Sequence, residues 1–300
     1  MKNGGLNYQK DVLKKTKKKK KLVLKKKFVI LFLILFSSLG IYSGLNVLRW
    51  LIDAKNTKKQ IENVQEVVKI EEVVSSENVE IINPPEEEVN EENPYWDYIK
   101  INLINVDFND LKEKNSDIVG WLQVSGTNIN YPFVQTTDNA YYLKKNFNKK
   151  YSSAGWVFMD YRNNLQNLDQ NTIIYAHGRI DGTMFGSLKN VTSDTWYNNQ
   201  DNHIVKISTE YQNTLWQVFS VYIIPNTNDY LEINFNDNEK YMEFLNMIKE
   251  RSKYNFDVSL NEFDKILTLS TCYKQNDRIV LHAKLIKMED KNGNNWRFKK

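Results

Sequence analysis

The sequence has very little of the chemistry on which many active sites depend: its 300 residues include one cysteine and three histidines. One cysteine cannot form a disulfide within its own chain, which excludes a secreted scaffold built on disulfides. The cysteine and histidines also lack the spacing of metal ligands, so no metal site is predicted. A glycine-rich phosphate-binding loop is missing too, because the stretch 178–186 lies in the wrong sequence context. We therefore expect no cofactor.

The part of the chain that is long enough to fold has no excess of basic charge. Residues 1–27 hold 12 lysines and one acidic residue, and residues 28–61 hold four basic residues and one acidic residue. Residues 62–92 hold 11 glutamates and one lysine, whereas residues 93–300 hold 24 basic and 24 acidic residues. The net charge of +4 therefore describes no single segment. A neutral folded part argues against a nucleic-acid partner.

A long uncharged run follows the lysines. Residues 28–48 form 21 positions without charge, which as a helix at about 1.5 Å per residue would span the roughly 30 Å hydrocarbon core of a bilayer. A cleaved signal peptide is the alternative, but the run exceeds the usual ~7–15 apolar residues and no Ala-x-Ala-like site follows. A buried core helix is less favoured because 12 lysines precede the run. We expect a transmembrane anchor over 28–52, with residues 1–27 as a cytoplasmic Lys-rich tail and the rest outside.

The next segment, residues 53–94, is rich in glutamate and has too little apolar surface for a core. Because like charges repel, this composition predicts an acidic spacer with some helix before Pro84. A coiled-coil stalk that dimerises is the alternative, although Ile61, Val64 and Val67 show only a hint of helical spacing.

The composition changes at residue 95, where aromatic residues and short alternating stretches begin, and residues 95–300 are expected to form one domain. Eight strands and two helices are predicted, which makes the domain mainly β and favours a closed barrel or a sandwich. On the second helix, Tyr241, Phe244 and Ile248 share one face, and Asp237 or Asn236 can cap its start. The predicted strands are 120–124, 129–134, 155–159, 171–176, 203–208, 215–224, 265–271 and 278–286, and the helices are 108–115 and 238–251.

The single cysteine, Cys272, comes at the end of a predicted strand and directly before a polar stretch. Strand ends with following loops are where rigid scaffolds present reactive groups, which favours a nucleophile. A small buried side chain is the alternative interpretation of a lone cysteine.

A cysteine nucleophile needs a neighbouring base or imidazolium. His177 also projects from a strand end into a loop, whereas His203 follows a polar run and is expected at the surface. His282 lies in the middle of a strand, where a packed role is expected. Arg278 begins the strand after Cys272, so a short hairpin would bring its guanidinium back as a donor for an oxyanion; an ordinary surface arginine is the alternative.

These residues and their surroundings resemble a known family. The stretch Thr268-Leu269-Ser270-Thr271-Cys272 matches a TLxTC signature, with an arginine in the next strand. The chain is in this respect similar to the sortases, membrane-anchored cysteine transpeptidases of Gram-positive bacteria. The resemblance runs from about residue 108 to residue 287 and is to class B members in particular, through the stretches 126–132, 138–143, 153–155, 158–163 and 181–188.

The resemblance implies an eight-stranded sortase-type barrel with several helices, one of them between the sixth and seventh strands. It also implies that Cys272 attacks the carbonyl of a threonine in a sorting signal and forms a thioester. His177 would protonate the leaving amine and later deprotonate the incoming one, and Arg278 would hold the substrate and its developing oxyanion. The substrate-contact positions that carry over are Asn139, Leu143, Tyr175, Ser270 and Thr271.

The implied partners are surface proteins with an NPxTx- or LPxTG-like sorting signal, an amine of a peptidoglycan cross-bridge or a pilin, and the lipid bilayer. The sequence departs from the family pattern at two places: Tyr175-Ala176-His177-Gly178 stands where the family shows Tyr-Gly-His-Asn, and the interval from Cys272 to Arg278, beside the expected substrate groove, is short for class B. A hydrolytic cysteine peptidase is the alternative, although histidine before cysteine is not the papain order. A non-catalytic, membrane-tethered binding protein is the third hypothesis.

Overall fold

A computed structural model describes residues 26–73, 78–85, 93–273 and 276–291, with only the backbone of Cys272 and Tyr273. Residues 1–25 of the expected tail, residues 74–77 and 86–92 of the expected spacer, and the sulfur of Cys272 lie outside the described part. The chain divides into two units, Met1–Trp50 and Leu51–Lys300.

Helix α1 (Lys26–Val67) contains the uncharged run, and its side chains from residue 26 to residue 52 are all exposed. Within the described ranges it is the one helix that is long and apolar enough to cross a membrane. The residues predicted as an anchor, 28–52, lie within this helix.

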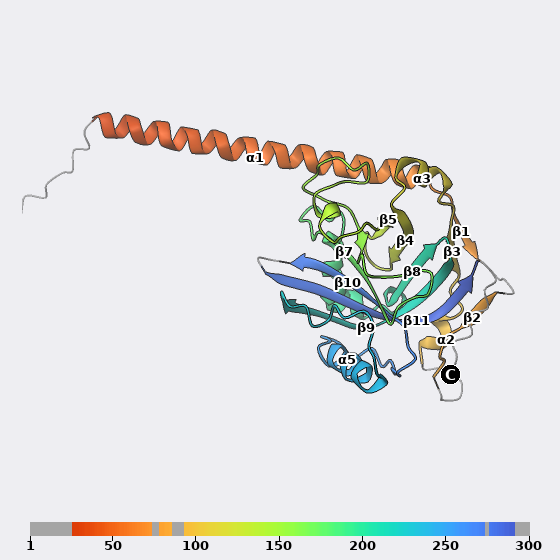
Figure 1. The fold of residues 1–300 in the computed structure, drawn as a ribbon. Coiled ribbons are helices and arrows are strands. Elements are labelled where there is room, and N and C mark those ends of the chain that lie inside the picture. Colours follow the sequence, from red (N-terminus) through yellow and green to blue (C-terminus); the bar gives the residue numbers. More distant parts are fainter. Residues whose placement is uncertain (1–25, 74–77, 86–92, 274–275, 292–300) are drawn as a thin grey trace, which may run out of the picture. The chain divides into compact units, whose positions relative to one another are not determined.

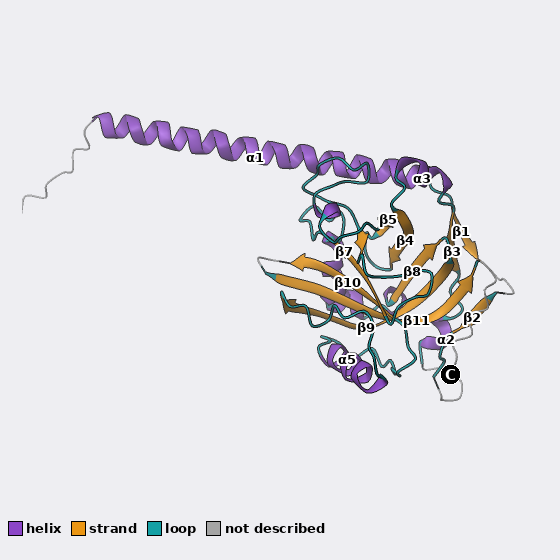
Figure 2. Ribbon diagram, in the orientation of Figure 1, coloured by secondary structure: helices purple, strands orange, loops and turns teal. Residues whose placement is uncertain are grey.

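Eight strands of the second unit form a closed barrel (Figures 1 and 2). The hydrogen-bonded order is β10-β7-β6-β5-β4-β8-β9-β11, and a further pairing of β10 with β11 closes the ring. Closure leaves no open edge within the ring, so the backbone polar groups of each strand have neighbours on both sides. The barrel strands are β4 (Ile118–Val124), β5 (Asn130–Val134), β6 (Phe158–Met159), β7 (Asn171–Ala176), β8 (Ile204–Thr209), β9 (Gln212–Pro225), β10 (Ile266–Tyr273) and β11 (Asp277–Asp290).

The barrel confirms the predicted fold class and each of the eight predicted strands. The observed bounds differ from the predicted ones by a few residues at the majority of strand ends. The main core cluster of the second unit contains large apolar side chains that are almost completely buried, such as Trp121, Phe133 and Phe219. Strand β9 is buried along most of its length. Its inward-facing side chains lie in the barrel, and its outward-facing side chains are covered by other elements.

Helix α5 (Asn238–Glu250) lies in the connection between β9 and β10, the sixth and seventh barrel strands, as predicted (Figure 1). Its buried face carries Tyr241, Phe244, Leu245 and Ile248. Asp237 caps it, because its carboxylate accepts a 2.8 Å hydrogen bond from the backbone N–H of Lys240. The shorter helices are α2 (Tyr95–Tyr98), α3 (Asn109–Lys114), α4 (Asp194–Tyr197), η1 (Tyr141–Leu143), η2 (Gly186–Thr192) and η3 (Gln200–Asn202).

The end of α1 packs within the second unit, which differs from the expectation of a spacer. Its buried side chains, Ala54, Thr57, Ile61 and Val64, recur at spacings of three and four residues and so form one helical stripe. Ile61 and Val64 belong to the main core cluster. The apolar residues behind the weak helical spacing in the sequence are therefore buried against other parts of the same chain.

Part of the glutamate-rich segment also forms strands. Strand β1 (Ile70–Val73) pairs with β3 (Leu103–Val106), and β2 (Val79–Ile81) pairs with the end of β11. Backbone pairing needs no apolar excess, because the N–H and C=O groups of any residue can make it. Composition alone therefore does not reveal this order.

Candidate active site

Two strand pairings bring the predicted catalytic residues to one end of the barrel. Strands β10 and β7 run parallel, and the last registered pair between them is Thr271 with Ala176. Cys272 follows Thr271 in β10, and His177 is the first residue after β7. On the other side of β10, Cys272 is registered directly with Arg278 of the antiparallel strand β11. Because neighbouring strands lie about 4.8 Å apart, the backbones of all three residues are close together.

His177 is held by the backbone of a neighbouring loop. Its ring nitrogen Nε2 lies 2.8 Å from the carbonyl oxygen of Leu143. A carbonyl oxygen only accepts hydrogen bonds, so Nε2 carries a hydrogen and donates it. This contact fixes the ring's orientation. It also leaves the other nitrogen, Nδ1, as the one that can gain or lose a proton while the contact is kept.

A buried carboxylate joins two of the predicted substrate-binding residues. Asp160 is 0% exposed, and its Oδ2 accepts hydrogen bonds from Asn139 Nδ2 at 2.9 Å and from the Tyr175 hydroxyl at 3.0 Å. Arg162 pairs with the same carboxylate through Nε and NH2, both at 2.9 Å. Burial raises the pKa of Asp160, but the hydrogen bonds from Arg162, Asn139 and Tyr175 outweigh burial and hold that pKa below its ordinary value.

The hydroxyls of the residues just before Cys272 make internal contacts. Thr271 Oγ1 donates to the carbonyl oxygen of Ala176 at 2.7 Å, and Ser270 Oγ lies 2.9 Å from the Tyr230 hydroxyl. Thr271 and Ser270 are 2% and 3% exposed. Leu143, by contrast, is an exposed residue beside His177, and Arg278 is half-buried, with its NH1 donating to the carbonyl of Asp277 at 3.2 Å. The guanidinium of Arg278 therefore lies near the start of β11, beside the backbone of Asp277.

The sequence profile described as Sortase domain matches residues 122–286, which is more than half of the chain. The chain belongs to the sortase family. Sortases are cysteine transpeptidases of the cell envelope, and anchoring proteins to the cell wall is their known role.

Individual relatives assign this sortase to a class B-like group, as the sequence predicted. Sortase B of Staphylococcus aureus is 38% identical over 185 residues, which cover 60% of this chain and 75% of that protein. The solved Staphylococcus aureus sortase B-substrate complex is 38% identical, with a TM-score of 0.57 over 60% of this chain and 84% of that one. The crystal structure of sortase B from B. anthracis in complex with AAEK1 is 32% identical, with a TM-score of 0.62 over 79% of this chain and 99% of that one.

Gly155 allows the histidine and its carbonyl partner to come together in this sortase. It has a positive φ of 59°, which disfavours other residues. A Cβ atom at this position would lie 2.5 Å from the Tyr142 carbonyl oxygen, 3.0 Å from that of Leu143 and 3.1 Å from Cδ2 of His177. A side chain would therefore push apart the groups that orient His177.

The other two histidines of the sortase are structural. His282 is fully buried between the Tyr222 hydroxyl, 2.8 Å from Nε2, and Thr268 Oγ1, 2.9 Å from Nδ1, which confirms its predicted packed role. The prediction that His203 lies at the surface is wrong. It is 7% exposed, and its ring packs 4.8 Å, centroid to centroid, from that of Phe256. The polar run before it ends in the short 3-10 helix η3, after which the chain enters the core.

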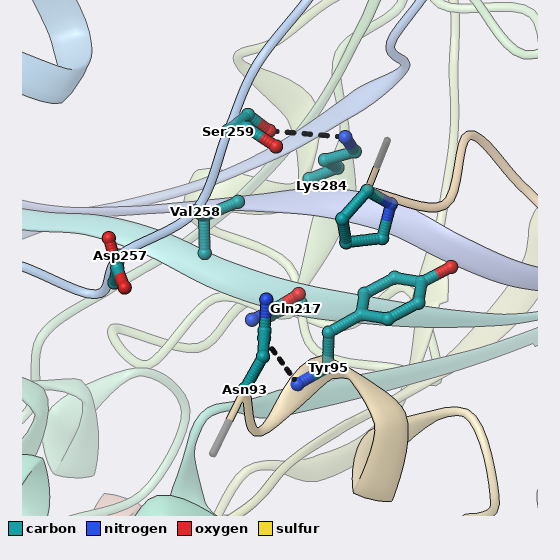
Figure 3. A pocket seen from close by; sticks show the side chains of 8 residues that line it. Asn93, Tyr95, Gln217, Asp257, Val258, Ser259 and Lys284 are labelled. Carbon is teal, nitrogen blue, oxygen red and sulfur yellow. Dashed lines mark hydrogen bonds between the residues drawn. The ribbon is translucent and has the colours of Figure 1, made fainter. Parts of the chain in front are cut away.

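The sortase also has a pocket that is lined by none of the predicted site residues. Asn93, Tyr95, Gln217 and Lys284 contribute to its wall (Figure 3). Lys284 Nζ donates to the carbonyl of Ser259 at 3.1 Å, so this ammonium is already engaged. Across the described residues no cluster of three or more histidine, cysteine or acidic side chains could hold a metal ion.

Three parts of the site escape sequence reasoning about catalytic side chains. The Leu143 carbonyl is a backbone group, so no residue type signals it. Gly155 and Asp160 do leave a signal, because they fall within the stretches 153–155 and 158–163 that resemble class B sortases. That resemblance does not say which groups these residues contact.

Proposed function

We propose that this sortase cleaves the sorting signal of a surface protein after threonine, forms a thioester on Cys272, and transfers the acyl group to an amine of the cell wall or of a pilin. The observation that carries the proposal is the strand register, in which Cys272 is paired with Arg278 and follows the Thr271–Ala176 pair that leads into His177. Membership of the sortase family supports the same reaction class.

In the first half of the proposed reaction, the thiolate of Cys272 adds to the carbonyl carbon of the threonine. The carbonyl oxygen becomes an oxyanion, for which the guanidinium of Arg278 supplies N–H donors and positive charge. The carbon–nitrogen bond then breaks, and the leaving amine takes a proton from the imidazolium of His177. The products are a thioester and a released C-terminal fragment.

In the second half, an incoming amine attacks the thioester and gives its proton to His177. The tetrahedral species collapses, an amide bond forms, and the thiolate of Cys272 leaves. Because Nε2 of His177 is engaged with the Leu143 carbonyl, Nδ1 is the nitrogen that exchanges the proton in both halves.

The sorting signal is proposed to contact Asn139, Leu143 and Tyr175. Two observations support this role. All three residues are at least partly exposed, and Asn139 and Tyr175 are hydrogen-bonded to Asp160 while the Leu143 carbonyl is hydrogen-bonded to His177. A related sortase B has been solved as a substrate complex. Ser270 and Thr271 are proposed to support binding of the signal indirectly, because the hydrogen bonds of their hydroxyls hold the end of β10 in place.

For the whole chain we propose a single-pass membrane protein. Residues 1–27 would be cytoplasmic, residues 28–52 would be the anchor, and residues 53–94 would link it to the catalytic domain, 95–300, outside the membrane. The packing of the end of α1 supports a linker that is partly held by the catalytic unit. External protease added to wall-less cells should digest the domain, and complete protection would contradict this orientation.

The reaction is tested with the full chain in detergent micelles, peptides of the NPxTx and LPxTG types, and triglycine or a lysine peptide as the amine. A product that contains both peptide and amine, and that disappears in Cys272→Ala, supports transfer. Cleavage that is equally fast without amine identifies a hydrolytic peptidase instead. Binding without turnover for any peptide would identify a tethered binding protein, and turnover by Cys272→Ala would refute the thioester mechanism.

A further inference from the structure

The carboxylate of Asp53, near the end of the predicted anchor, joins two segments that both adjoin the ring of His177. Its Oδ2 accepts hydrogen bonds from Arg179 NH1 at 3.2 Å and from Ser153 Oγ at 2.7 Å. Its Oδ1 accepts a hydrogen bond from Ser152 Oγ at 3.1 Å. One side chain of α1 thus contacts the loop after His177 and the turn before Gly155.

The first segment is the loop that follows His177. Arg179 comes two residues after the histidine, and its side chain is only 8% exposed. Its guanidinium lies between two carboxylates, Asp53 and Asp181, with NH2 2.9 Å from Asp181 Oδ2. A charge buried to this degree is strongly destabilising without partners, so Arg179 and its loop are held where both carboxylates are.

The second segment is the turn that adjoins the histidine ring. The backbone N–H of Ser152 donates to the Lys144 carbonyl at 3.1 Å, and the Ser152 carbonyl accepts from the N–H of Gly155 at 3.3 Å. Ser152 therefore connects the chain around Leu143, which accepts the hydrogen bond from His177, with Gly155, which adjoins the ring. A shift of Ser152 would move both neighbours of the imidazole.

Asp53 itself is held by the helix that carries it. Ala54 and Thr57, one and four residues later, are 8% and 5% exposed, and Ile61 and Val64 continue the same buried stripe. The position of the Asp53 carboxylate is therefore set by packing and not by a mobile linker. It comes five residues after the uncharged run 28–48.

We propose that Asp53 is a positioning residue for His177, so that the helix segment next to the anchor is part of the active-site support. The proposal rests on the proposed transfer reaction for its kinetic test. The geometry supports this role, because Asp53 accepts hydrogen bonds from both segments that set the orientation of the imidazole. Loss of the carboxylate should therefore affect the proton transfers more than peptide binding.

The test compares the full chain in detergent micelles with Asp53→Ala, Asp53→Asn, Asp53→Glu and the control Gln65→Ala. Gln65 makes another polar contact from the same helix, because its Nε2 donates to the Asn130 carbonyl at 2.8 Å, and it has no part in the Asp53 contacts. Thermal unfolding first establishes that each variant is folded. Asp53→Asn keeps the size of the side chain, so it is informative even if Asp53→Ala does not fold.

Two readouts decide the role of Asp53. For Asp53→Ala and Asp53→Asn, kcat of transfer should fall roughly 10- to 100-fold with KM within about twofold, as expected for a misplaced catalytic group. The pH midpoint for alkylation of Cys272 by iodoacetamide should also shift, because the thiolate depends on the neighbouring imidazole. Asp53→Glu should recover part of kcat, and Gln65→Ala should stay within about twofold of the parent with an unchanged midpoint.

The proposal is overturned if Asp53→Asn is folded and keeps both kcat and the alkylation midpoint. It is also overturned if Gln65→Ala reproduces the effects of Asp53→Ala, since the helix then acts through stability alone. The alkylation readout needs no sorting signal. If the parent transfers no peptide, the proposed function fails, while a midpoint that shifts in both His177→Ala and Asp53→Asn still supports the positioning role.

Discussion

The hydroxyl of Thr271 donates a 2.7 Å hydrogen bond to the carbonyl oxygen of Ala176, one residue before the proposed nucleophile and the proposed base. The bond joins the parallel strands β10 and β7 at their last registered pair. It therefore limits how far the backbones of Cys272 and His177 can move apart, at a position beyond which the two strands are no longer paired.

Thr271→Val removes this hydrogen bond with little change in shape. We expect a loss of about 1 kcal/mol in the free energy of unfolding and roughly 10-fold in kcat/KM for transfer, because the separation of the two reacting groups becomes less restricted. Unfolding in urea and steady-state kinetics measure the two effects. Thr214→Val is the control for stability alone: it removes a 3.3 Å hydrogen bond to the Ile207 carbonyl between β9 and β8, and also the acceptor of a 2.8 Å hydrogen bond from Trp216 Nε1. It should lower stability while leaving kcat/KM within about twofold.

The Asp160 carboxylate offers a test of the substrate site. Asp160→Asn removes the charge that orders Asn139, Tyr175 and Arg162 and replaces one acceptor by a donor. We expect KM for the peptide to rise about 10-fold, with a smaller change in kcat, because a bidentate, charge-assisted arrangement holds the binding residues. Kinetics against peptide concentration separate the two constants.

Asp169→Asn is the control for this carboxylate. Asp169 also accepts several hydrogen bonds, including one from Asn163 Nδ2 at 2.9 Å and one from Asn234 Nδ2 at 2.9 Å, but it contacts neither Asn139 nor Tyr175. Its replacement should reduce stability and leave KM nearly unchanged. An equal rise of KM in both variants would show that Asp160 acts on the fold and not on the binding residues.

Gly155→Ala tests the close packing around His177. The added Cβ would lie 2.5 Å from a backbone oxygen, so the loop around Tyr142 must shift and with it the Leu143 carbonyl. We expect kcat to fall roughly 10- to 100-fold, in addition to about 1–2 kcal/mol of destabilisation from the left-handed backbone.

Gly182→Ala separates these two effects. Gly182 has a φ of 78°, but the nearest atom to its added Cβ would be Asn128 Nδ2 at 3.7 Å. The control therefore carries the backbone strain without the collision, and its activity per folded molecule should be retained. If the two variants lose equal activity, crowding of the His177 contact is not the cause.

The sequence predicts the strands well because each one has its own pattern of apolar and turn residues; β7 is found with the predicted bounds, 171–176. Which strands are neighbours is not contained in such patterns. The approach of Cys272 to His177 depends on the parallel pairing of β10 with β7, and only the family resemblance pointed to it. Asp53 illustrates the same limit: a carboxylate beside an apolar run suggests solvent, yet it pairs with Arg179, 126 residues away.

His282 gives a prediction about stability and pH. Thr268 Oγ1 donates to Asn171 Oδ1 at 2.7 Å, so toward Nδ1 of His282 it acts as an acceptor, and the Tyr222 hydroxyl donates to Nε2. The ring is thus held neutral. Burial, with a contribution from the charge of Arg251, lowers the pKa of His282 to about 3. In the unfolded chain the pKa is about 6.5, so between these values only the unfolded state binds the proton.

The free energy of unfolding should therefore fall as the pH drops below about 6.5, by about 1.4 kcal/mol per pH unit from this histidine. His282→Gln lacks the titrating ring and should lose this part of the slope, although it is less stable at pH 7. Urea unfolding of both proteins at pH 7 and pH 4.5 measures the difference, in which the carboxylates common to both cancel. Identical slopes in the two proteins would mean that the folded state accepts the proton on His282, which would contradict the neutral, doubly hydrogen-bonded ring.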